Sequence, residues 1–132
     1  MVRGIRNNNP GNIRKSGDNW RGLVPDDMQT DKSFFIFDNA LFGIRALMKI
    51  LLTYESKYGL NTVRGIIDRW APPVENDTES YILHVSEKLG VLSNEEINVY
   101  DNLVPLAQAI IKHENGINPY SAATLEDAKK LV

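Results

Sequence analysis

The chain has 132 residues, of which 42% are hydrophobic and 24% charged, and its formal net charge is −2. This length predicts one domain, residues 1–132, that buries about two thirds of its unfolded surface. The lack of cysteine excludes disulfides and thiolate chemistry, and no apolar run approaches the roughly 18 residues of a membrane span.

Cofactor and partner classes are narrowed by the histidines and by the distribution of charge. His84 and His113 do not have a metal-ligand spacing, so we expect no metal and no cofactor. Residues 1–22 carry five basic side chains against one acidic, whereas residues 75–101 carry seven acidic against one basic. A basic end can contact polyanions, but no nucleic-acid motif is present, so we expect no nucleic-acid partner and a monomeric protein.

The first part of the chain, residues 1–33, is rich in turn-forming residues and has almost no helical period. All residues of Asn7–Asn12 favour turns, because asparagine tolerates the left-handed conformation and Pro-Gly suits a type II turn. The short apolar pieces Trp20–Val24 and Phe34–Phe37 are typical of strands, with Pro25–Asp27 between them. The sequence therefore predicts a small N-terminal β-hairpin or sheet.

Helical order is predicted to begin at Asp38, a good N-cap. A long amphipathic helix then extends to Gly59, which can adopt the left-handed conformation that ends a helix. Gly43 within this helix indicates close packing against a neighbour rather than flexibility. The apolar positions of the helix are Leu41, Ile44, Leu47, Met48, Leu51, Leu52 and Tyr58.

Two shorter helices follow. Thr62 is predicted to cap the first, and Ala71–Pro73 ends it, because proline cannot donate a backbone hydrogen bond and restrains the residue before it. Asp77 or Thr78 begins the second, which Gly90 closes. Its apolar face consists of Tyr81, Ile82, Val85 and Leu89.

Weaker signals predict two more helical pieces. Ser93 and Glu96 form a capping-box pattern for another short helix. Thr124 is predicted to cap a last weak helix near the end of the chain. Together with the N-terminal strands, these elements predict an α+β domain that is mostly helical.

The strongest late helix, Leu103–Glu114, carries a carboxyl group at the end of its apolar stripe. The stripe consists of Leu103, Leu106, Ala107, Ile110 and Ile111 at helical spacing. Glu114 continues this face, Gly116 ends the helix and Pro119 prevents its resumption. A partly desolvated carboxyl group can keep a proton near neutral pH, as a general acid must. The alternative is a glutamate that turns out to solvent.

Three stretches together resemble the lysozyme-like superfamily of peptidoglycan-cleaving enzymes. Asn7–Arg14, with Trp20 and Gly22 after it, is similar to phage-encoded lysozyme-like and virion proteins. Glu75–Val85 resembles the E-T-x-x-Y-V-x-x-V helix of soluble lytic transglycosylases. Ile110–Gly116 resembles the helix-ending glutamate that serves these enzymes as general acid.

The order of these stretches differs from the usual family order. In the family the glutamate helix comes first and the hairpin follows it, whereas here the hairpin-like stretch opens the chain. A circular permutation reconciles the two orders, since domain termini often lie near each other at the surface. The resemblance thus implies a circularly permuted lysozyme-like fold in which Glu114 packs beside the loop Asn9–Arg14.

The resemblance also implies a reaction, cleavage of the bond between N-acetylmuramic acid and N-acetylglucosamine in the glycan strand of peptidoglycan. A lytic transglycosylase can use a single glutamate as acid and then as base, whereas a muramidase that hydrolyses the bond uses a second carboxylate. No second carboxylate is evident beside Glu114, which favours the single-acid route. Asp38, Glu75 and Asp77 remain candidates for hydrolysis.

The site residues implied by the resemblance are Glu114 and Tyr81 as catalytic residues, with Asn9, Asn12, Arg14, Trp20 and Glu75 binding substrate. Each has a plainer interpretation. Tyr81 lies on an apolar face and can be core, the asparagines can simply form turns, and Glu75 can favour the dipole of the next helix. Trp70 can line a sugar groove, but its spacing from Ile67 favours the core, and we interpret His113 as structural.

The leading hypothesis is a phage-type or prophage-derived lytic enzyme, either an endolysin or a virion-associated lysin. Residues 1–6 lack a signal-peptide apolar region, so we expect it to pass from the host cytoplasm to the periplasm by another route, or to travel in the virion. A second hypothesis is a non-catalytic virion structural or cell-wall-binding module. A third is a small polyanion-binding domain that uses the basic N-terminal stretch.

Overall fold

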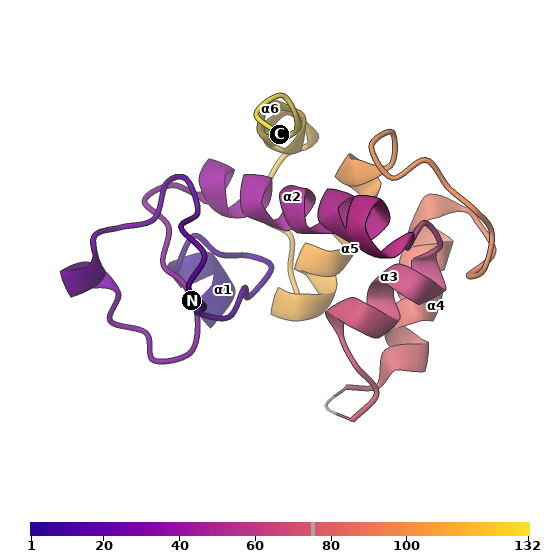
Figure 1. Ribbon diagram of the computed structural model, residues 1–132, viewed down its shortest axis with the longest axis horizontal. Helices are drawn as coiled ribbons and strands as arrows, with labels where there is room; N and C mark the ends of the chain where they lie inside the picture. Colours follow the sequence, from indigo (N-terminus) through magenta and orange to yellow (C-terminus); the bar gives the residue numbers. More distant parts are fainter. Residues whose placement is uncertain (75) are drawn as a thin grey trace.

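The computed structural model describes residues 1–74 and 76–132. Most of the described chain is helical, as the sequence predicts, and the helices surround a long central one (Figure 1). The α-helices of this part of the chain are α1 (Arg3–Arg6), α2 (Ala40–Tyr58), α3 (Val63–Trp70), α4 (Thr78–Leu89), α5 (Leu103–Asn115) and α6 (Ala122–Lys129), with a 3₁₀ turn at Asp26–Met28.

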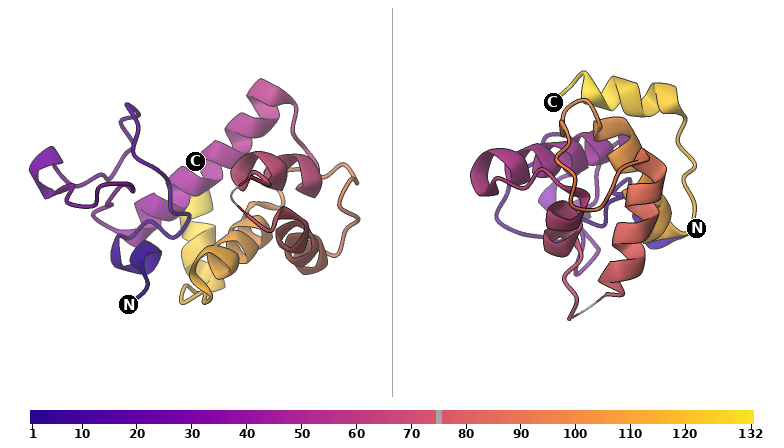
Figure 2. Two further views of the ribbon diagram at one scale, coloured as in Figure 1. Left: turned by 90° about the horizontal axis from the view of Figure 1, so that it is seen from below. Right: turned by 90° about the vertical axis from the view of Figure 1, so that its right-hand side faces the viewer.

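The long helix α2 organises the molecule. Asn39, one residue beyond the predicted cap, accepts a hydrogen bond from the Leu41 amide at 2.8 Å, and Gly59 ends the helix in the left-handed conformation as predicted. The N-terminal loops lie around the beginning of α2, and α3 and α4 lie toward its other end (Figures 1 and 2). The helix α6 packs on α2 on the side away from α3.

The predicted signals at the ends of α3 and α4 are confirmed. The Thr62 hydroxyl accepts a hydrogen bond from the Gly65 amide at 3.0 Å and begins α3. Asp77 caps α4 through the Ser80 amide, and Gly90 closes it. The last helix, α6, begins earlier than predicted because Ser121, not Thr124, accepts the capping hydrogen bond.

The main hydrophobic core contains side chains from each helix from α2 through α6, and a smaller core lies under the N-terminal loops. In the main core, side chains such as Leu47, Ile66 and Ile110 are fully buried, and each such side chain contributes about 1.5–3 kcal/mol. The smaller core consists of Ile13, Phe35, Phe37 and Ala46. Trp70 is half-buried and packs against both cores, so it bridges the N-terminal loops and the helices.

The predicted N-terminal sheet is wrong. Within the described residues the segment forms only isolated antiparallel bridges, Arg14 with Phe34 and Leu23 with Phe37. The Ile36 carbonyl accepts a hydrogen bond from the Val24 amide at 3.2 Å, and the Gln29 side chain bonds to the same residue. Gln29 donates to the Ile36 carbonyl at 2.8 Å and accepts from its amide at 2.9 Å, so the Ile36 amide bonds to a side chain rather than to a neighbouring strand.

The short helix predicted from Ser93 and Glu96 is also absent from the described structure, where this stretch forms turns. The Leu92 amide donates to the Glu95 carboxylate at 3.2 Å. The Ser93 carbonyl accepts a hydrogen bond from the Arg64 amide at 2.8 Å. The segment therefore serves as a connection that holds the start of α3.

None of the described helices is long and apolar enough to cross a membrane.

Candidate active site

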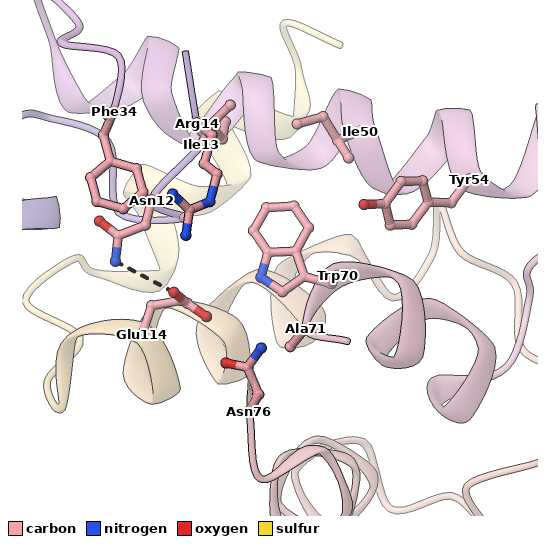
Figure 3. A pocket seen from close by; sticks show the side chains of 11 residues that line it. Asn12, Ile13, Arg14, Phe34, Ile50, Tyr54, Trp70, Ala71, Asn76 and Glu114 are labelled. Atoms are coloured by element: carbon pink, nitrogen blue, oxygen red, sulfur yellow. Dashed lines mark hydrogen bonds between the residues drawn. The ribbon is translucent and has the colours of Figure 1, made fainter. Parts of the chain in front are cut away.

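A cleft of about 280 Å³ lies where the N-terminal loops meet the helices. It combines residues from the first, middle and last parts of the chain (Figure 3). Its lining consists of Gly11, Asn12, Ile13, Arg14 and Phe34 from the N-terminal segment, Ile50 and Tyr54 from α2, Trp70 and Ala71 from the end of α3, Asn76 before α4, and Glu114 from α5.

Glu114 reaches this cleft from the last turn of α5. The fully buried Ile110 and Ile111 fix the preceding turn in the core, and Gly116 ends the helix with a φ of 75°. The Glu114 side chain is half-buried and faces the cleft, with the Asn12 amide beside it (Figure 3). The position at the end of an apolar stripe thus leads into a cleft rather than out to bulk solvent.

Both carboxylate oxygens of Glu114 have hydrogen-bond donors. The Tyr81 hydroxyl donates to Oε2 at 3.0 Å, and the Asn12 side-chain amide donates to Oε1 at 3.4 Å. These donors come from α4 and from the N-terminal loop, far from α5 in sequence. The structure therefore brings together three residues that the sequence analysis assigned to one site.

Tyr81 is buried with its hydroxyl directed at the Glu114 carboxylate. Its side chain is 1% exposed, and burial, followed by the nearby Glu114 carboxylate, raises the pKa of the phenol well above its usual value. His113 stacks on the Tyr81 ring, with ring centroids 3.7 Å apart and planes inclined by 21°. The sequence analysis missed this contact, because adjacent positions on α5 point about 100° apart.

The loop that presents Asn12 is built by asparagine side chains. Asn9 is fully buried; its amide donates to the carbonyls of Ile13 and Phe35 at 3.0 and 2.9 Å and accepts from the Ile13 amide at 2.9 Å. Asn9 therefore holds the loop and does not face the cleft, unlike its predicted role in binding substrate. Asn8 and Asn12 both adopt the left-handed conformation, with φ of 51°.

A direct link ties this loop to the end of α5. The Asn115 side-chain amide donates to the Pro10 carbonyl at 2.8 Å and to the Ile111 carbonyl at 2.9 Å. Gly4 packs against Asn115 so closely that a Cβ atom there would collide with the Asn115 side chain. Sequence reasoning missed Asn115, and its position next to Glu114 was the one available signal.

The aromatic residues do not divide as the sequence predicts. Trp70 lines the cleft (Figure 3), and its ring lies so close to Gly11 that a Cβ there would be 3.3 Å from it. Trp20, predicted to bind substrate, packs instead against the small N-terminal core and is not part of the cleft lining. The cleft therefore has an aromatic wall, whose tryptophan comes from α3 and which also includes Phe34 from the N-terminal segment.

The remaining predicted residues fall in different places. Arg14 is exposed and lines the cleft, with its guanidinium 5.3 Å from the centre of the Phe34 ring. Glu75 lies outside the described residues. Asp77 caps α4, where its carboxylate also accepts from the Ser80 hydroxyl at 2.9 Å.

Glu114 is the one carboxylate among the described residues of the cleft lining. Asp38 is exposed and, like Asp77, is not part of that lining. Of the described residues, no three His, Asp or Glu side chains converge as metal ligands would. The arrangement can therefore donate and accept a proton at one carboxyl group, between an aromatic wall and an arginine.

Comparison with known proteins adds a phage context. No protein-family model matches the chain. It is 45% identical over 133 residues to "Protein P5" of Pseudoalteromonas phage PM2, and the alignment covers 98% of this chain and 79% of that protein. The name of the phage protein states no activity.

Proposed function

The chain belongs to the family of Protein P5 of Pseudoalteromonas phage PM2, and from the cleft around Glu114 we propose that it is a peptidoglycan-cleaving glycosidase of lysozyme-like, circularly permuted fold. The observation that supports this proposal most is the hydrogen bond of 3.0 Å from the Tyr81 hydroxyl to Glu114 at the cleft. Its substrate is the glycan strand, cleaved between N-acetylmuramic acid and N-acetylglucosamine.

In the first step Glu114 acts as the acid. The bond between C1 of N-acetylmuramic acid and O4 of N-acetylglucosamine breaks, and the Glu114 proton passes to O4. The acetamido oxygen of the same muramic acid residue bonds to C1 and takes up its electron deficiency. Tyr81 donates to Oε2, so Oε1, which has the longer contact to Asn12, is the oxygen freer to exchange the proton.

In the second step Glu114 acts as the base. The C6 hydroxyl of the muramic acid attacks C1, the bond from the acetamido oxygen to C1 breaks, and the hydroxyl proton returns to Glu114. The product carries a 1,6-anhydro ring and the acid is regenerated. This route needs one carboxyl group, in agreement with the single carboxylate among the described residues of the cleft lining. Hydrolysis by a second carboxylate is the alternative.

Support for the permuted order comes from the contact between chain segments that are remote in sequence. Asn12 and Pro10 of the N-terminal loop reach Glu114 and Asn115 at the end of α5. This is the spatial relation that the family order produces by direct succession of helix and hairpin. A permuted chain would have to restore it through long-range packing, as this chain does.

The test is clearing of purified cell walls by the native chain and by Glu114→Gln. We expect Glu114→Gln to clear walls roughly 10²- to 10⁴-fold more slowly, the scale of a lost general acid. Glu126→Gln, on the exposed face of α6, is the matched control and should clear at the native rate. Mass spectrometry of the released muropeptides separates an anhydro product from a hydrolysed one, since they differ by one water.

Three outcomes would contradict the proposal. Equal clearing by native protein and Glu114→Gln would remove Glu114 as the acid. Sedimentation of both proteins with walls, without clearing, would instead identify a virion structural or wall-binding module. Binding to nucleic acid that falls steeply with salt would favour a polyanion-binding domain.

A further inference from the structure

An arginine guanidinium lies over the rings of two tyrosines beside the cleft. Tyr54 and Tyr58 are four residues apart on α2, so they share one face of the helix. The Arg69 guanidinium, from the last turn of α3, lies 3.7 Å from the centre of the Tyr58 ring and 5.4 Å from that of Tyr54. Stacking of this kind holds the planar guanidinium in one orientation.

This cluster continues the cleft. Tyr54 lines the cleft that contains Glu114 and, at the same time, a shallower hollow of about 750 Å³ that contains Tyr58 and Arg69. In the close view the Tyr54 hydroxyl points back toward Trp70 (Figure 3). A strand bound along the cleft past Trp70 would therefore reach Arg69.

The charge of Arg69 is not neutralised by an ion pair with any described carboxylate. Asp68 lines the same hollow but makes no such pair with it. Arg64, on the same helix, is different: it forms a two-pronged ion pair with Glu79 at 2.8 and 3.1 Å. Arg69 thus keeps its N–H donors available for an external carboxylate, which a planar guanidinium binds through two parallel hydrogen bonds.

We propose that Tyr54, Tyr58 and Arg69 form a subsite that binds a carboxylate of the peptide carried by N-acetylmuramic acid. This inference rests on the proposed function, because it takes the occupant of the cleft to be a glycan strand. Each muramic acid bears its peptide on the lactyl group at C3, so the peptide carboxylates project sideways from a bound strand. The subsite would make the protein prefer peptide-bearing strands to bare ones.

The test measures binding to two soluble glycan strands of equal length, one with its peptides and one from which an amidase has removed them. The stripped strand keeps the short lactyl carboxylate at C3 of each muramic acid but lacks the carboxylates of the peptide. All proteins carry Glu114→Gln, so that cleavage does not complicate the measurement. We expect the protein with Arg69 to bind the peptide-bearing strand about tenfold more tightly, and Arg69→Gln to lose that preference. Affinity for the stripped strand should stay the same.

Two matched variants separate this role from charge and from folding. Arg64→Gln removes the same charge from the same helix away from the cleft and should keep the preference. Arg69→Lys keeps the charge but not the two-pronged geometry and should retain only part of it. Circular dichroism and thermal unfolding confirm that each variant is folded.

The outcomes distinguish the subsite from the proposed function. Equal affinity of the Arg69 protein for both strands, with wall clearing by the native chain, would overturn the subsite and leave the function intact. If Arg64→Gln lost the preference for peptide-bearing strands as Arg69→Gln does, the preference would come from net positive charge alone, and the subsite would be overturned. No binding to either strand, with no clearing by the native chain, would overturn both.

Discussion

Glu114 has unequal hydrogen bonds at its two oxygens, and this inequality is the central chemical feature at the residue scale. Oε2 accepts from a buried phenol at 3.0 Å, whereas Oε1 accepts from Asn12 at 3.4 Å. A carboxyl group held at one oxygen keeps its orientation while the other oxygen exchanges a proton. Tyr81 is therefore expected to act on the orientation of Glu114 more than on the substrate.

The first prediction concerns the Tyr81 hydroxyl. We expect Tyr81→Phe to lower kcat/KM roughly 10- to 100-fold, the range of a lost hydrogen bond to a charged group. The ring and its stack on His113 remain, so the free energy of unfolding should change by only about 1 kcal/mol. Tyr100→Phe, at an exposed ring, is the control for loss of a phenol hydroxyl. Native activity in Tyr81→Phe would remove Tyr81 from the site.

The second prediction concerns the pH dependence of stability through His113. Burial, followed by His84, lowers the pKa of His113 from its usual value, although Glu114 and Asp77 act in the opposite direction. Because the lowered pKa means that the unfolded chain binds more protons than the folded one, the folded state loses stability as the pH falls through the region of the histidine pKa. This contribution is fully present above the unfolded pKa of about 6.5.

His113→Phe keeps a flat ring against Tyr81 and removes the titrating group. We expect the decrease in Tm between about pH 8 and about pH 5 to be smaller in this variant than in the native chain. His84, whose ring centroid lies 5.7 Å from that of His113, is present in both proteins. An unchanged pH profile would show that His113 makes no such contribution.

The positions of individual residues were only partly predictable from the sequence. Glu114 and Tyr81 could be placed side by side because a helical stripe and the resemblance to lysozyme-like enzymes indicated both their position and their direction. Asn9 and Trp20 could not, because a polar loop residue and a lone tryptophan give no indication of depth. The loop folds back on itself, so the Asn9 amide donates to backbone carbonyls inside the loop. Trp20 packs against the small N-terminal core.

At the scale of elements, helix ends follow local chemistry and were predictable. Thr62, Asp77, Gly59 and Gly90 act within one helical turn of their own position, so no tertiary information is needed. The N-terminal strands were not predictable, because their pairing competes with side-chain amides from elsewhere in the segment. Gln29 reaches Ile36 across seven positions and accepts from its amide, which a regular ladder would have paired with backbone.

The third prediction concerns the contact between the N-terminal loop and α2. A Cβ atom at Gly43 would collide with the backbone carbonyl of Asn8, which cannot move aside as a flexible side chain would. We therefore expect Gly43→Ala to lower the free energy of unfolding by about 2 kcal/mol, despite the better helix propensity of alanine. Gly17→Ala, where a Cβ meets no atom within 4 Å, is the control. Denaturant titration measures both, and equal stability would contradict the close contact.

At the scale of the whole molecule, the cleft is made from segments that sequence periodicity cannot bring together. The period of α5 predicts which face of that helix is buried, but not that its end meets the loop around Pro10. That meeting depends on α2, which supports the loop at its first turn and the core helices along its length. Only the resemblance to lysozyme-like enzymes predicted that the end of α5 meets this loop, because a permuted order requires the glutamate helix and the hairpin-like stretch to lie next to each other.

The fourth prediction tests this long-range contact between the N-terminal loop and the end of α5. Asn115→Ala removes the hydrogen bond to the Pro10 carbonyl, which spans 105 positions in the sequence. We expect wall-clearing activity to fall about tenfold or more, because the loop then no longer fixes Asn12 beside Glu114, while the free energy of unfolding falls by only about 1–2 kcal/mol. Asn94→Ala, at an exposed turn residue, should leave both unchanged. A loss of activity no larger than the loss of folded protein would refute a specific role for this contact.

The joining of an early loop to a late helix also has a temporal consequence during translation. Asn12 leaves the ribosome long before Glu114. A growing chain therefore contains the N-terminal residues of the cleft before Glu114 has been synthesised. A fragment that ends before Glu114 lacks the carboxyl group, and one that ends before Asn115 also lacks the hydrogen bond to the Pro10 carbonyl. A chain that terminates before the last turn of α5 therefore lacks the carboxyl group on which the proposed function depends.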